Sequence, residues 1–66
     1  MTINQPSVSK DVAGRVADRL TVILGLNGLL LDGAFGPLTD RQKGAVGEML
    51  QTTEEVRALL EPFLKQ

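Results

Sequence analysis

The 66-residue sequence contains no histidine, cysteine, tryptophan or tyrosine. The absence of cysteine excludes disulfides, thiolate metal ligands and thiol nucleophiles, and the absence of histidine removes the imidazole base and a common metal ligand. No pair of carboxylates stands in an apolar segment in the way that a general acid requires. We therefore expect no catalytic residue, no metal site and no cofactor, and we interpret the chain as a non-enzymatic protein.

An excess of one charge and a long apolar run are also absent. The formal net charge of -1 provides no basic field for nucleic acid or an anionic membrane. No apolar run approaches the roughly 18 residues that span a bilayer, and the N-terminus does not resemble a signal peptide. These features predict a cytoplasmic protein that binds neither nucleic acid nor membrane.

Apolar residues at three- and four-residue steps predict a first helix over about residues 9–32, after a flexible lead-in at 1–8. Ser9 is a favourable N-cap, and Asp11 in the first turn suits the helix dipole. Gly33 is a natural residue with which to end the helix.

A turn at 33–38 precedes a second predicted helix, over about 39–61. Thr39 and Gln42 have the spacing of a capping box. Pro62 cannot continue the hydrogen-bond ladder, so this helix should stop or kink near Leu60 or Glu61. The predicted fold is all-α: an antiparallel helical hairpin spanning residues 9–66.

The apolar surface of the two helices exceeds what one hairpin can cover. The second helix carries a heptad stripe, formed by Gln42, Val46, Met49, Thr53, Val56, Leu60 and Phe63. The second half of the first helix is apolar over more than half of its circumference, which is typical of a helix buried on several sides. Because natural domains below about 70–80 residues usually need an added constraint, we expect a homodimer that forms a four-helix bundle. Its expected core is Val16, Leu20, Ile23, Leu26, Leu30, Val46, Met49, Val56 and Leu60.

Residues 20–33 read LTVILGLNGLLLDG, and residues 34–42 read AFGPLTDRQ. This string resembles the dimerisation and histidine-phosphotransfer (DHp) domain of bacterial sensor histidine kinases, in which the region commonly reads L-N-A-I-L-G-F-S-E-L-L-L-D-G-x-F-G-P-L-T-x-x-Q. The resemblance covers about residues 13–60. It implies a helical hairpin that dimerises into a four-helix bundle.

The family's catalytic signature, H-E-x-x-T/N-P, falls on residues 14–19 and is not conserved in this chain. Gly14 replaces the phosphoacceptor histidine, Arg15 the assisting acid, Asp18 the phosphatase Thr or Asn, and Arg19 the proline. The resemblance therefore implies the family's fold without its phosphotransfer reaction, since fold does not imply function.

A strip of small residues lies opposite the apolar arc of the first helix, with Ala17 at its edge, and further small residues stand near the start of the second helix. It consists of Gly14, Ala17, Asp18, Thr21, Gly25, Gly28, Gly44 and Gly47. Response regulators dock against the corresponding region in the family, so the resemblance implies a partner-docking strip. Two alternatives stay open: an exposed face can collect small residues under weak constraint, and Gly44 and Gly47 can let the helices close together near the turn.

Asn27 falls inside the apolar arc, where it either sets the register of the bundle or lies partly exposed near the end of the hairpin. The sequence as a whole favours a non-catalytic signalling protein that docks a response regulator receiver domain or a histidine kinase. The alternatives are a pure dimerisation or scaffold element, and an inhibitor that forms dead mixed dimers with a kinase.

Overall fold

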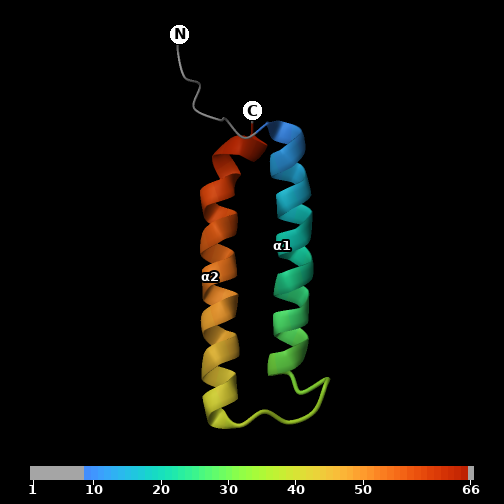
Figure 1. The fold of residues 1–66 in the computed structure, drawn as a ribbon, viewed down its shortest axis with the longest axis vertical. Coiled ribbons are helices and arrows are strands. Elements are labelled where there is room, and N and C mark those ends of the chain that lie inside the picture. The colour runs from blue at the N-terminus through green and yellow to red at the C-terminus, as the bar shows by residue number, and fades with distance from the viewer. Residues whose placement is uncertain (1–8, 66) are drawn as a thin grey trace.

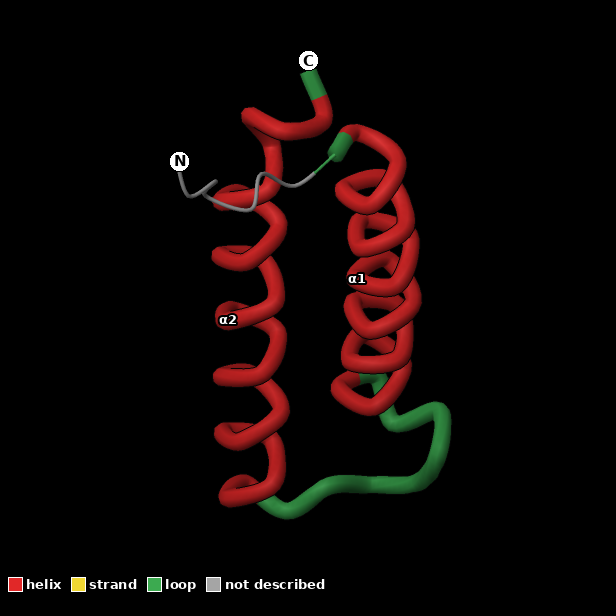
Figure 2. Tube along the Cα trace, turned by 45° about the horizontal axis from the view of Figure 1, so that its top comes forward, coloured by secondary structure: helices red, strands yellow, loops and turns green. Residues whose placement is uncertain are grey.

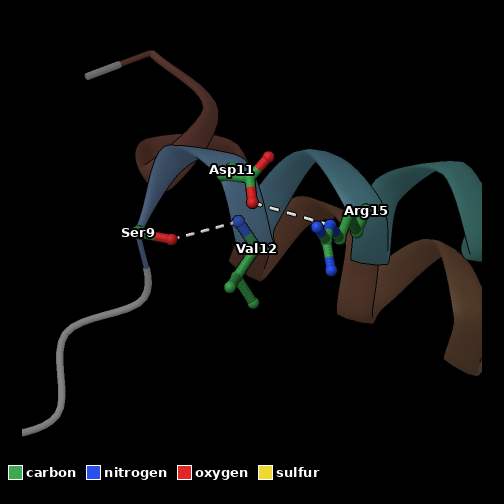
Figure 3. A network of polar contacts seen from close by, with 4 residues as sticks. All are labelled: Ser9, Asp11, Val12 and Arg15. Carbon is green, nitrogen blue, oxygen red and sulfur yellow. Dashed lines mark hydrogen bonds and ion pairs between the residues drawn. The ribbon is translucent and has the colours of Figure 1, made fainter.

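The computed structural model describes residues 9–65 as two helices joined by one loop. Helix α1 spans Lys10–Leu31 and begins at Ser9, whose Oγ accepts a hydrogen bond of 3.1 Å from the backbone N–H of Val12. Figure 3 shows this cap beside an ion pair of 3.5 Å between Arg15 and Asp11. Both charged side chains are well exposed, so the pair contributes little to stability. The predicted start of the first helix is confirmed.

The C-terminus of α1 is closed by a pair of backbone hydrogen bonds around Gly33. The N–H of Ala34 donates to the carbonyl of Leu29 at 3.0 Å, and the N–H of Gly33 donates to that of Leu30 at 3.1 Å. Gly33 has a φ of 82°, which glycine adopts without the steric cost that a Cβ brings. This is the Schellman arrangement, and it confirms the end predicted at Gly33.

Helix α2 spans Asp40–Leu64 and begins with the predicted capping box. The N–H of Gln42 donates to Oγ1 of Thr39 at 3.0 Å, and the N–H of Thr39 donates to Oε1 of Gln42 at 2.9 Å. Each side chain thus satisfies a backbone donor that the helix itself leaves free.

Pro62 lies inside α2, which continues to Leu64 instead of ending near residue 61. One proline removes a single hydrogen bond and bends the helix, and Figure 1 shows the last turn bending over the start of α1. Phe63 and Leu64 pack there against a core cluster of Ala13, Leu20 and Leu60. The bend therefore covers the open end of the hairpin.

The two helices lie side by side and antiparallel in both views (Figures 1 and 2). Their contact follows a seven-residue spacing on each helix. The buried residues are Ala13, Leu20 and Asn27 on α1, and Val46, Thr53 and Leu60 on α2. Each step of seven along α1 is matched by a step back along α2, as antiparallel packing requires. The all-α helical hairpin is confirmed, and neither described helix is long and apolar enough to cross a membrane.

Alanine substitutions at two glycines should change stability in opposite directions. At Gly25 a Cβ would meet no atom within 4 Å, so Gly25→Ala should stabilise the fold by about 1 kcal/mol through helix propensity. Gly33→Ala places a Cβ at positive φ and should destabilise it by about 1 kcal/mol. Urea unfolding followed by circular dichroism measures both changes, and a stabilised Gly33→Ala variant would contradict the assigned helix end.

Candidate functional site

Each helix of the hairpin touches only one other helix, so two broad faces of the molecule are uncovered. At about 100° per residue, side chains that flank the α1–α2 contact point to one face or the other. One face is apolar, and the other carries small and charged residues.

The apolar face combines large side chains from both helices that remain between 37% and 73% exposed. We use this name for Val12, Val16, Ile23 and Leu26 of α1 together with Met49, Val56 and Leu59 of α2. Exposed aliphatic side chains scattered singly over a surface are ordinary. The side chains of this set instead gather along one side of two adjacent helices.

A hollow of about 350 Å³ lies in the middle of the apolar face. It forms because short side chains interrupt the row of large ones on α2: Ala45 and Thr52 stand one heptad apart and flank Met49. Ile23 of α1 forms the opposite wall. The sequence analysis missed this hollow, and the only signal for it was the heptad spacing of two short residues beside the apolar stripe.

The residues expected in the dimer core divide into two groups in the structure. Leu20, Val46 and Leu60 are buried within the hairpin itself, and Leu30 is half-buried. The others remain exposed on the apolar face; these are Val16, Ile23, Leu26, Met49 and Val56. The predicted stripe of α2 is therefore split: its positions 46, 53 and 60 contact α1, whereas 49 and 56 point to the open face.

Two polar residues occupy the contact between the helices. The hydroxyl of Thr53 donates to the backbone carbonyl of Met49 at 2.7 Å, so its burial is satisfied. Asn27 is only 4% exposed, and its Nδ2 has no hydrogen-bond partner. Of the two readings of Asn27, the partly exposed one is therefore wrong. A buried amide without a partner lowers stability by about 1–3 kcal/mol.

The strip of small residues is only partly assembled. Gly14, Gly28 and Gly47 are half-buried, and a Cβ added at any of them would meet no atom within 4 Å. Thr21 and Gly25 are exposed on the same side of α1. The Thr21 hydroxyl donates to the carbonyl of Ala17 at 3.0 Å.

Three positions of the strip differ from the expectation. Ala17 is half-buried and packs against the core cluster, so it contributes little open surface. Asp18 and Gly44 are exposed, but the helical period places them on the outer sides of α1 and α2, away from the other members. Glycines near the turn are not needed for close helix approach, because no neighbouring atom occupies the space beside Gly44 or Gly47.

The described part of the chain gathers no group of three or more acidic side chains that could hold a metal ion. Its charged residues lie exposed along the helices.

Comparisons with models of known protein families, with curated proteins and with solved structures gave no match.

Replacing Asn27 with leucine should stabilise the hairpin. The substitution keeps a side chain that branches at Cγ and removes the unpaired donor, so the free energy of unfolding should rise by about 1–3 kcal/mol. Urea unfolding at a fixed protein concentration measures the change. Asn27→Ala is the control, because it removes the donor but leaves a void and should gain less. A destabilised leucine variant would show that the amide makes a favourable contact.

Proposed function

We propose that this chain is a non-catalytic interaction module that works as a homodimer, in which two hairpins stack through their apolar faces into a four-helix bundle. The observation that carries the proposal is the apolar face itself, to which both helices contribute. A second copy presents the same surface, so the contact is self-complementary in the way that a two-fold dimer requires.

The small size of the hairpin core supports this proposal. Among residues 9–65 the buried apolar residues are Ala13, Leu20, Val46 and Leu60, and no large side chain in this range is fully buried. A chain of this length buries only about 60% of the surface that its unfolded form exposes. Without disulfides, covering the apolar face is the remaining way to add a substantial hydrophobic contribution.

The dimensions of the face also suit a second copy. The side of the hairpin that carries this face is about 37 Å long, the length of a 25-residue helix at 1.5 Å per residue, and about 20 Å wide, two helix diameters; the large apolar side chains of the face occupy about 21 Å of that length. Its footprint of roughly 750 Å² is close to the ~800 Å² that each partner contributes to a stable interface. One further helix would cover only about half of it, whereas a second hairpin covers all of it.

The role that we assign to the dimer is to dock a signalling partner without transferring phosphate. The face that carries the strip of small residues stays on the outside of the bundle when the two apolar faces are joined. Because its side chains are short, the backbone of a partner helix can approach it closely. The resemblance to kinase dimerisation domains supports a response regulator receiver domain as that partner. Gly14 has no side chain to accept a phosphoryl group, so the contact would be binding alone.

A mixed dimer with a histidine kinase is the second candidate function, and the same apolar face supports it. A kinase domain with a similar hairpin would present a similar apolar surface to this chain. The resulting dimer would contain one subunit without a phosphoacceptor. The remaining alternative is a pure dimerisation scaffold. Such a scaffold would use the apolar face alone and would need no contact on the small-residue face.

Ile23→Lys should disrupt the homodimer. Burial of an isoleucine side chain contributes about 1.5–3 kcal/mol, and each dimer loses two of them, so the dissociation constant should rise by about 100-fold or more. Sedimentation equilibrium measures the change. Leu29→Lys is the matched control on the outer side of α1, where the leucine is already 45% exposed. Equal effects of the two substitutions would contradict the assigned face.

Gly25→Arg should abolish binding of a receiver domain while the homodimer persists. The arginine would fill the space beside α1 that a partner backbone needs. Titration calorimetry against purified receiver domains from the source organism measures the binding, with Gly25→Ala as the control. Unchanged affinity in the arginine variant with an intact dimer would eliminate the small-residue face as the docking site and favour the scaffold.

A further inference from the structure

Arg19 interrupts the apolar face near the middle of α1. It lies between Val16 and Ile23 on the α1 side of that face, and it is exposed. Among residues 9–65 the one ion pair is Arg15–Asp11, so Arg19 has no acidic partner within that part of the chain. A charged residue in the middle of an apolar contact surface restricts how a second copy can be seated on it.

The charges that border the apolar face are divided by helix. The border along α1 carries Arg15 and Arg19, and the border along the middle of α2 carries Glu48 and Glu55. The helical period places Arg15, Glu48 and Glu55 on the outer flank of the apolar side chains, and it places Arg19 within the α1 half of the face. One edge of the face is therefore basic at mid-height and the other is acidic.

Two hairpins can stack these faces with their loops at opposite ends or at the same end. With the loops at opposite ends, α1 lies on α1 of the second copy and α2 lies on α2. Because Arg19 is close to the middle of its helix, full overlap would bring the two Arg19 residues within about 5 Å along the axis, by the 1.5 Å rise per residue. Glu48 would likewise face Glu55 of the second copy, and like charges at such positions oppose association.

With the loops at the same end, α1 of each copy lies on α2 of the other. Arg19 then lies opposite Thr52 and beside Glu55 of the second copy, so unlike charges meet on both edges. The large side chains Ile23 and Leu26 of α1 lie at the height of the hollow between Ala45 and Thr52. Large residues over small ones pack without voids.

We propose that the second copy docks with its loop at the same end as that of the first, that Arg19 forms an ion pair with Glu55 of the second copy, and that Leu26 fills the hollow at Ala45 and Thr52. This rests on the proposed homodimer and adds its orientation and the charge pair that selects it. The pair occurs twice, once on each edge of the bundle.

Charge reversal tests the ion pair. Arg19→Glu alone and Glu55→Arg alone should each raise the dimer dissociation constant by about tenfold or more, because each places like charges together at two sites. The double variant should recover to within about threefold of the native value. Glu54→Arg, one residue away on the other flank of α2, is the matched control and should have little effect. If the losses of dimer stability in the two single variants simply add in the double variant, the ion pair is overturned.

Distances between loops test the orientation. The chain has no cysteine, so Ala34→Cys in the loop provides a single position for a spin label. Loops at the same end should give a label separation below about 30 Å, and loops at opposite ends one above about 37 Å, the length of α2. A long distance in a dimeric sample would overturn the orientation while leaving the homodimer intact. A monomer in sedimentation equilibrium would instead overturn the proposed function.

Discussion

A single layer of two helices cannot enclose its own apolar side chains, and this geometric constraint governs the rest of the molecule. An α-helix buries one stripe against one neighbour. In this hairpin the contact takes one position in each heptad, such as Leu20 on α1 and Thr53 on α2. The next apolar positions around each helix, such as Ile23 and Met49, point to a side where the chain has nothing to cover them.

The hairpin is well specified locally even though its core is small. Ser9 and the Thr39–Gln42 capping box fix both helix starts, and Gly33 ends α1 through its positive φ. The bend at Pro62 then folds the end of α2 over Ala13. These local devices each contribute about 1 kcal/mol or less. They define the shape, while large apolar side chains such as Ile23, Met49 and Leu59 remain exposed on the open surface.

Sequence reasoning predicted the helices and their capping because those features depend on residues three or four positions apart. It predicted the set of apolar residues as well, but it did not separate those that contact the neighbouring helix from those on the open face. Val46 and Met49 belong to one heptad stripe, and only the relative rotation of the two helices decides which is buried. The hollow at Ala45 and Thr52 and the unpaired amide of Asn27 depend on that same rotation. Of the two outcomes predicted at Pro62, a stop or a kink, the structure shows the kink: the helix bends and continues to Leu64, because its packing against the core cluster continues beyond the proline.

Folding coupled to association is the central claim of this account, and the most direct test is the dependence of thermal unfolding on protein concentration. If two copies cover each other's apolar faces, mass action requires the midpoint to rise as the chain is concentrated. We predict a clear increase in Tm between about 1 μM and 100 μM in circular dichroism melts. A cooperative transition with the same Tm across this range would contradict the account, since it would mean that the isolated hairpin is stable with its apolar face exposed to water.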